Sequence, residues 1–217
     1  MDLQLIFDLL FERYGPQGWW PLHGKHSGKQ PSSDREVFEI IIGAVLTQNT
    51  SWNNVEKALW NLRSNGMISR QKIAESDEKV IANLIRPAGY YNQKARKLKI
   101  VAKSKAKTRK ELLDLWGIGP ETADSIMLYA FGKPYFVIDA YTKRIFSRIG
   151  IKIEKKGKNY SEWQDFFMSN LPKNIELYKE YHALIVEHAK RHCRSKPVCS
   201  GCVLRKICGY CKDMTSE

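Results

Sequence analysis

A short turn flanked by two glycines constrains the fold of this chain more than any other feature of its sequence. Residues 115–123 read Leu-Trp-Gly-Ile-Gly-Pro-Glu-Thr-Ala, with Gly117 and Gly119 on either side of one apolar residue. Glycines so spaced let the backbone turn sharply between two helices and leave its amides facing outward. Exposed amides at the start of a helix bind a phosphate oxygen well. The spacing therefore predicts a hairpin of two helices that holds a phosphate.

A single carboxylate follows this hairpin at the end of an apolar run. Asp139 comes directly after Tyr-Phe-Val-Ile, residues 135–138. It could lie at the mouth of a groove, near whatever the hairpin holds. Each part has a plainer interpretation, because a lone Gly-x-Gly is often a tight turn and an Asp before a helix is often an N-cap. The order and spacing of the whole set favour a functional site.

The charge of the chain points to a polyanionic partner. Its 217 residues include 36 Lys and Arg against 23 Asp and Glu, which gives a formal charge of +13. Nine of these basic residues lie between Lys94 and Lys110 without one acid, and we expect a solvated, positively charged helix and turn there. Nucleic acid is the leading partner for such a chain.

Composition and hydropathy exclude several other classes of protein. An apolar fraction of 43% supports a globular core, so the chain is not a disordered protein. No apolar run is long enough to span a bilayer, and the N-terminus lacks the pattern of a signal peptide. We expect an intracellular, cytoplasmic protein that associates with DNA and with no membrane.

Helical periodicity runs through the chain, and no strand-like alternation persists. Ser33 to Glu36 has the form of a capping box, and the apolar segment Val37–Leu46 after it is expected to be a buried central helix. The pattern predicts an all-α fold with a polar loop around Lys155–Lys158. Further helices are expected over residues 3–11, 52–62, 70–74, 77–85, 91–103, 108–115, 121–131, 140–148, 161–168 and 175–192.

All five cysteines lie near the C-terminal end of the sequence. Cys193-x5-Cys199-x2-Cys202-x5-Cys208 places four thiols at short separations, and Cys211 is left over. A disulfide framework would be spread over the fold, so a metal centre fits better. Four such thiolates can hold one [4Fe-4S] cluster. The pairs Cys199-x2-Cys202 and Cys208-x2-Cys211 could instead form two zinc knuckles.

The hairpin, the apolar run and Asp139 together resemble the helix-hairpin-helix glycosylase superfamily, which includes endonuclease III and the adenine glycosylases. The cysteines closely resemble the iron-sulfur loop of endonuclease III, with five residues between the first two ligands instead of the usual six. The resemblance implies a two-lobed fold with the active site in the cleft between the lobes. It implies a helical barrel over 29–132 with the hairpin, and a terminal domain over 1–28 plus 133–217 with the iron-sulfur loop at 193–208.

The resemblance also implies a mechanism. Asp139 would stabilise the positive charge that develops on the sugar as the N-glycosidic bond breaks. Gln48, in Leu-Thr-Gln-Asn-Thr, matches a Gln that enters the gap left by an extruded nucleotide, although it could simply end a helix. In the lyase branch a lysine stands two places after the second hairpin glycine. Here that place holds Glu121, which cannot form an imine, so we expect a monofunctional glycosylase.

The aromatic residues resemble those of the 3-methyladenine DNA glycosylase branch. Trp19, Trp20 and Trp52 would stack on a base made cationic by alkylation, although tryptophans are also common in cores. That branch can lack the cysteine loop, so the chain mixes features of two branches. An endonuclease III-like glycosylase and abasic-site lyase acting on oxidised pyrimidines stays open, as does a non-catalytic DNA-binding module.

The expected partner is double-stranded DNA with a damaged base, bound by a monomer. Phosphate contacts would supply affinity that depends on salt and not on sequence. The residues expected to contact DNA are Gln48, Gly117, Gly119, Thr122, Lys143, Arg205 and Lys206.

Overall fold

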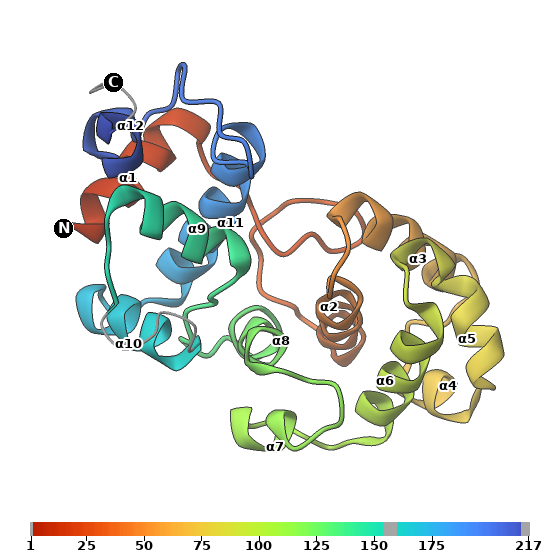
Figure 1. The fold of residues 1–217 in the computed structure, drawn as a ribbon. Coiled ribbons are helices and arrows are strands. Elements are labelled where there is room, and N and C mark those ends of the chain that lie inside the picture. The colour runs from red at the N-terminus through yellow and green to blue at the C-terminus, as the bar shows by residue number, and fades with distance from the viewer. Residues whose placement is uncertain (1, 154–159, 214–217) are drawn as a thin grey trace. The chain divides into compact units, whose positions relative to one another are not determined.

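A computed structural model describes residues 2–153 and 160–213 as two compact units (Figure 1). One unit is built from both ends of the chain, up to Trp19 and from Pro134 onward, and the other from residues 20–133. The described residues are helical and form no strand, so the all-α fold predicted from the sequence is confirmed. The polar loop expected around Lys155–Lys158 lies outside the described residues.

One apolar helix forms the core of the middle unit. This helix, α2 (Asp34–Leu46), is buried over all of its last nine residues and contacts α3 (Trp52–Ser64) and α6 (Tyr91–Lys103). It also contacts the continuous segment formed by α8 (Pro120–Ser125) and the π-helical η2 (Ile126–Ala130) (Figure 1). A helix that is apolar on every side is stable only when neighbours cover it all round. The prediction of a buried central helix is confirmed.

The start of α2 explains why this helix is longer than its apolar run. The Ser33 hydroxyl accepts a hydrogen bond from the Glu36 amide at 3.3 Å, which caps the helix. The Glu36 carboxylate accepts hydrogen bonds from the backbone and hydroxyl of Ser32, at 2.6 and 2.7 Å. The expected capping box is therefore only half formed.

The other elements of the middle unit are short and lie around this core. α5 and α4 both pack on α6, and η1 packs on α3. Their bounds are α4 (Arg70–Glu75), α5 (Glu78–Leu84), the 3-10 turn η1 (Arg86–Ala88) and α7 (Arg109–Leu113).

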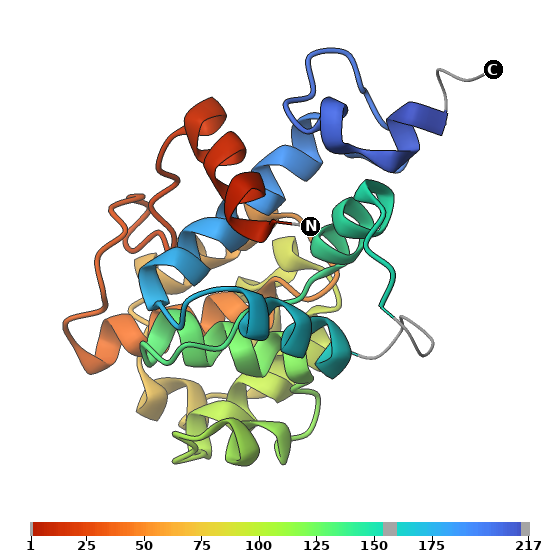
Figure 2. The ribbon, with the colours of Figure 1, turned by 90° about the vertical axis from the view of Figure 1, so that its left-hand side faces the viewer.

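In the terminal unit, α11 (Ile175–Arg191) contacts both α1 (Leu3–Tyr14) and α9 (Ala140–Ile149) (Figure 2). Aromatic rings fill the space between these helices, and Phe136 and Phe167 stack with their centroids 4.4 Å apart. The buried Tyr181 hydroxyl donates to the Leu3 carbonyl at 2.8 Å, which ties α11 to the start of α1. The remaining elements are α10 (Tyr160–Asn170), the 3-10 turn η3 (Arg205–Ile207) and α12 (Gly209–Asp213).

The expectation of a solvated basic helix is wrong for one residue of the middle unit. Lys94, in the first turn of α6, has only 2% of its surface exposed. Its ammonium group donates to the carbonyls of Leu46 and Ala88, at 2.9 and 2.8 Å. These carbonyls lie at the ends of α2 and η1, where backbone acceptors lack partners within the helix. A basic side chain can be buried in such a place because its donors are satisfied.

Candidate active site and DNA-binding elements

Asp139 ends an extended apolar segment and caps the helix that follows. Residues 136–138 are buried in the terminal unit, and Asp139 takes the N-cap of α9 in an extended conformation. Its Oδ1 accepts from the Thr142 amide at 2.6 Å and from the Thr142 hydroxyl at 2.8 Å. The cap thus uses one carboxylate oxygen, and Oδ2 is left for other contacts.

The second carboxylate oxygen faces a histidine of α11. Nε2 of His182 lies 3.7 Å from Oδ2 of Asp139. Burial by itself raises the pKa of Asp139, but the contacts with His182 and Thr142 outweigh burial and hold the pKa below its ordinary value of 3.8. The carboxylate is therefore ionised at neutral pH. A fixed negative charge of this kind can stabilise a cation that forms beside it.

In the middle unit, the side chain of Gln48 is held in a network of three hydrogen bonds. Its Oε1 accepts from the Lys97 ammonium group at 2.5 Å. Its Nε2 donates to the Gly117 carbonyl at 3.1 Å and to the Thr122 hydroxyl at 2.9 Å. The structure thus brings together three of the residues expected to contact DNA, namely Gln48, Gly117 and Thr122. Insertion of Gln48 into DNA stays a prediction.

The hairpin turn has the backbone that its glycines predict. Gly117 has a φ of 80°, which disfavours other residues, and the stem of Lys97 lies where a Cβ on Gly117 would be. Gly119 is the N-cap of α8 and has open space where a side chain would be. The outward side of the turn is therefore free for a ligand to approach the backbone closely.

A buried ion pair joins the two arms of the hairpin. The Arg109 guanidinium in α7 donates to both carboxylate oxygens of Asp124 in α8, at 2.6 and 3.1 Å. Asp124 is fully buried. Two parallel bonds of this kind fix orientation as well as distance. This ion pair therefore fixes the positions of the two helices on either side of the turn.

The remaining predicted site residues are exposed or half-buried. Glu121 is exposed in the first turn of α8, where a carboxylate is favourable against the helix dipole. Lys143 is half-buried on α9, one turn after Asp139. Arg205 and Lys206 are exposed on η3. Contacts of Lys143, Arg205 and Lys206 with DNA stay predictions.

The three tryptophans expected in a base pocket differ in burial. Trp20 is only 5% exposed, and its ring packs edge-on against Trp52 and Tyr129 at centroid distances of 5.2 and 5.3 Å. Its ring also fills the space beside Gly43, where a Cβ would lie 2.7 Å from the indole. Trp52 and Trp19 are half-buried. Trp20 is a core residue of the middle unit, and the base-pocket role of all three stays a prediction.

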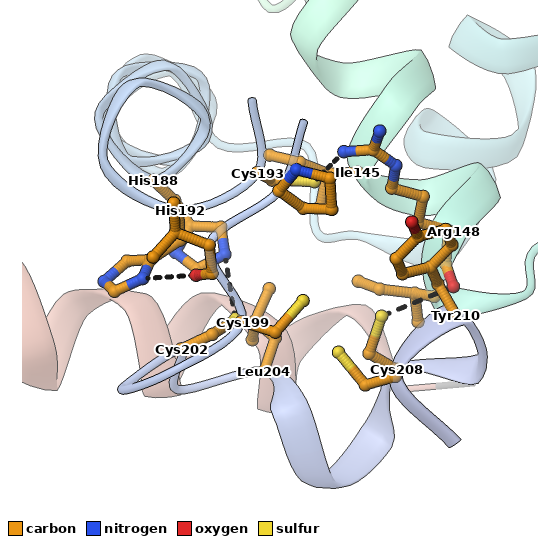
Figure 3. A pocket seen from close by; sticks show the side chains of 14 residues that line it. Ile145, Arg148, His188, His192, Cys193, Cys199, Cys202, Leu204, Cys208 and Tyr210 are labelled. Carbon is orange, nitrogen blue, oxygen red and sulfur yellow. Dashed lines mark hydrogen bonds between the residues drawn. The ribbon is translucent and has the colours of Figure 1, made fainter. Parts of the chain in front are cut away.

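The five cysteines line a common pocket in the terminal unit (Figure 3). Burial raises the pKa of Cys211 to about 12, and hydrogen bonding with Cys199 and Cys208 adds to that rise. The thiols of Cys199, Cys208 and Cys211 are therefore close enough to share hydrogen bonds. No three His, Cys, Asp or Glu side chains of the described residues are placed to share one metal ion. A [4Fe-4S] cube is larger than one ion and accepts ligands that stand farther apart.

Two arginines of α9 bind the backbone of the cysteine loop. Arg144 donates to the Cys193 carbonyl at 2.7 Å. Arg148 donates to the carbonyls of Arg194 and Ser195, at 2.6 and 2.8 Å, and lies 3.2 Å from the sulfur of Cys193 (Figure 3). The positive charge of Arg148 thus lies beside a cysteine that is expected to bind the cluster. The same helix therefore carries Asp139 at its start and holds the cysteine loop at its end.

A histidine of α11 lies between a tyrosine and the cysteine loop. The Tyr14 hydroxyl is 2.9 Å from Nδ1 of His188, and Nε2 of His188 is 3.5 Å from the sulfur of Cys202. Burial lowers the pKa of His188 to about 4, so the ring is neutral. His188, His182 and both arginines were not identified from the sequence, because each contact joins helices that are far apart along the chain.

Fold and hairpin together define a class of protein. A family model for the HhH-GPD superfamily of base excision DNA repair proteins matches residues 42–173, and the chain belongs to this family. By its family the chain is a DNA glycosylase, as the resemblance of its sequence motifs to this superfamily predicted. No helix in the described part of the chain is long and apolar enough to cross a membrane.

Three known proteins show how similar the chain is to particular members. A Methanocaldococcus jannaschii protein, assigned by its description to the DNA repair glycosylases, is 46% identical over 94% of both chains. Endonuclease III of Sulfolobus acidocaldarius is 31% identical over 82% of this chain and 84% of its own. The structure of H. pylori 3-methyladenine DNA glycosylase bound to 1,N6-ethenoadenine has a TM-score of 0.73 and 32% identity, and covers 88% of this chain and 98% of that one.

Proposed function

We propose that this protein is a monofunctional DNA glycosylase that removes an alkylated purine such as 3-methyladenine from duplex DNA. The ionised carboxylate of Asp139 carries the proposal. When the N-glycosidic bond of an extruded nucleotide breaks, positive charge develops on the sugar, and a carboxylate beside it lowers the barrier. Proton transfer from the attacking water to a carboxylate would complete hydrolysis.

We expect no strand cleavage because the hairpin position at which a lyase carries its lysine holds a different residue here. A lyase needs an amine to attack C1′ and form a Schiff base, and Glu121 offers a carboxylate. The exposed side chain of Glu121 in the first turn of α8 is consistent with a purely electrostatic role there. Hydrolysis would then leave an abasic site in an intact strand.

The lesion is proposed from chemistry and from similarity. An alkylated purine carries positive charge, which makes it a good leaving group and attracts electron-rich rings. The 3-methyladenine DNA glycosylase of H. pylori is 32% identical to this chain and spans nearly its whole length. Trp19 and Trp52, which are half-buried, are the rings that we expect to reach the base.

A [4Fe-4S] cluster is proposed in the pocket that the cysteines line. Cys193, Cys199, Cys202 and Cys208 would hold it, and Cys211 would bind no iron but contact two of these ligands. Such a cluster crosslinks a loop that has little core of its own and can exchange one electron. The basic residues Arg205 and Lys206 between its ligands would be presented to DNA phosphates.

A panel of duplexes tests the proposal. Methylated, oxidised, deaminated and abasic substrates are incubated with the protein, and released bases and strand breaks are measured separately. We expect release of methylated purine, no strand break, and no covalent adduct when borohydride is added to the abasic duplex. A borohydride adduct would instead identify a bifunctional enzyme, the activity that similarity to endonuclease III of S. acidocaldarius favours. Normal binding without release of any base would identify a DNA-binding module.

We propose the cellular location of the protein from its family. A base excision repair protein works on DNA inside the cell, and we propose that this one binds a damaged duplex as a monomer. Sedimentation of the protein with and without a duplex tests the stoichiometry, and one protein per lesion is expected.

A further inference from the structure

The two oxygens of the Asp139 carboxylate have different partners. Oδ1 accepts two hydrogen bonds from Thr142, at 2.6 and 2.8 Å, within the first turn of α9. Oδ2 lies 3.7 Å from Nε2 of His182, which belongs to α11. The last torsion of an aspartate side chain is broad, so bonds at one oxygen leave the other some freedom to move. The position of Oδ2 therefore depends on the histidine.

The backbone that leads to Asp139 is held by α10. The Tyr160 hydroxyl accepts a hydrogen bond from the Ile138 amide at 3.2 Å. The buried side chain of Gln164 donates to the Phe136 carbonyl at 2.7 Å. Phe136 and Ile138 are themselves buried. The main chain is thus anchored directly before the acid, and the freedom that remains at this position is that of the Asp139 side chain.

His182 reaches Oδ2 from a helix whose position is fixed. α11 contacts both α1 and α9, and the residues on either side of the histidine, Tyr181 and Ala183, are buried. Only 16% of the His182 side chain and 11% of the Asp139 side chain are exposed, and Nε2 of the histidine is buried. A side chain so enclosed has little room to move. His182 can therefore act as a rigid partner of Oδ2.

The chemistry of this pair determines which ring nitrogen carries a proton. An ionised carboxylate has acceptors only, so Nε2, the nitrogen that faces it, is the protonated one. Burial raises the pKa of Asp139, and the contact with His182 comes first among those that lower it, ahead of both bonds from Thr142. The histidine therefore contributes more than the helix cap to keeping the buried acid charged.

We infer that His182 is a positioning residue for base release, which holds Oδ2 of Asp139 in one orientation so that the carboxylate meets the sugar of an extruded nucleotide. A charge that is already in place stabilises a developing cation well, because the reaction then needs no reorganisation around it. The histidine does not touch the substrate in this role. The inference rests on the proposed function, because it requires Asp139 to act on the sugar.

The first test removes the proton that faces Oδ2. His182→Phe keeps a ring of similar size and loses Nε2, and single-turnover release of methylated purine from a duplex measures the rate. We expect the rate to fall roughly 10- to 100-fold, as when a reacting group is slightly misplaced, with unchanged affinity for the duplex. The matched control is Tyr181→Phe, which loses a buried hydrogen bond of the same helix, to the Leu3 carbonyl, without contact with Asp139. Its rate should equal that of the wild type, and an equal rate in His182→Phe would overturn the inference.

Two conservative variants keep the inference testable if His182→Phe does not fold. The amide nitrogen of a glutamine can take the place of Nε2, whereas that of an asparagine lies nearer the place of Nδ1. His182→Gln should therefore recover most of the rate, and His182→Asn should stay slow. Equal rates of these two variants would overturn the inference.

Titration of Asp139 separates this role from a structural one and needs no substrate. Carbon-13 NMR of protein labelled in its aspartate carboxyl groups follows the titration, and Asp139→Asn assigns the signal. Without His182, burial of the carboxylate is less well opposed, so the pKa of Asp139 should rise in His182→Phe and stay in place in Tyr181→Phe. A slow His182→Phe variant whose Asp139 titrates as in the wild type would show that the histidine acts through packing alone, which overturns the inference.

Combining the changes shows whether His182 acts through the acid. In the Asp139→Asn background, His182→Phe should slow base release no further, because the charge that the histidine positions is absent. A further loss of the same size would overturn the inference. Failure of the proposed function has a different signature, namely no base release from any lesion, or release at the wild-type rate by Asp139→Asn, while His182→Phe still shifts the titration of Asp139.

Discussion

Replacing Asp139 by asparagine separates the two roles that the structure gives this carboxylate. Oδ1 caps α9 through Thr142, and asparagine caps a helix as well as aspartate does. The free energy of unfolding should therefore fall by less than ~1 kcal/mol, from the lost interactions of the charge with His182 and with the helix dipole. The negative charge of Asp139, in contrast, is lost completely in this variant. At a contact distance of about 4 Å and an effective dielectric constant of about 20, a carboxylate stabilises a cation by roughly 4 kcal/mol.

That energy corresponds to a rate reduced by about 10³-fold. Single-turnover release of methylated purine from a duplex measures the rate, and calorimetry measures stability. Asp139→Ala is the matched control, because it should lose the same rate and about 1 kcal/mol of stability besides, through loss of the cap. Base release at the wild-type rate by Asp139→Asn would refute the electrostatic reasoning. Equal stability of the two variants would refute the capping role.

The same variant gives a test in acid. Because the folded pKa of Asp139 lies below its ordinary value, the ionised group stabilises the fold fully above about pH 4. This contribution is lost as the pH falls through the folded pKa. The wild type should therefore be more stable than Asp139→Asn at pH 7, and the difference in urea midpoint should shrink toward pH 3. A difference that stays constant would show that folding does not lower the pKa of Asp139.

Three further outcomes are expected. Cys208→Ser should lose the visible absorbance of the proposed iron-sulfur cluster, whereas Cys211→Ser should keep it, and equal iron content in the two variants would contradict the proposed ligands. Asp124→Asn should cost about 2–4 kcal/mol of stability and weaken duplex binding, because it leaves Arg109 half-buried without its charge partner; an unchanged Tm would contradict this. Glu121→Lys should give a borohydride adduct that the wild type does not give, and an adduct in the wild type would contradict the monofunctional mechanism.

Helix positions followed from the sequence because caps and apolar periodicity are local signals. The helix expected over 91–103 has those bounds in the structure. Predicted helix ends elsewhere differ by a few residues, as at α2, which begins at Asp34 because Ser33 caps it. The turn at Gly117 was predictable for the same reason, since its backbone needs a glycine.

Contacts between distant segments could not be predicted in this way. Lys94 belongs to a run of basic residues that is otherwise typical of a solvated helix, and only the folded chain brings the ends of α2 and η1 to its ammonium group. His182 faces Asp139 from a different helix, and nothing local distinguishes it from a surface histidine. Trp20 illustrates the converse, since a tryptophan that suggests stacking on a base is packed against Gly43.

The ten residues of α9 form a helix about 15 Å long, with an acidic residue at its start and a basic residue in its last turn. Asp139, the proposed catalytic acid, caps the start of α9, and Arg144 in the middle of the helix and Arg148 in its last turn donate to carbonyls of the cysteine loop. Oxidative damage that unfolds this loop would break the hydrogen bonds from both arginines to its carbonyls. We expect α9 to fray from its C-terminal end, so that loss of the proposed cluster would slow catalysis without any change in the residues proposed to contact the sugar.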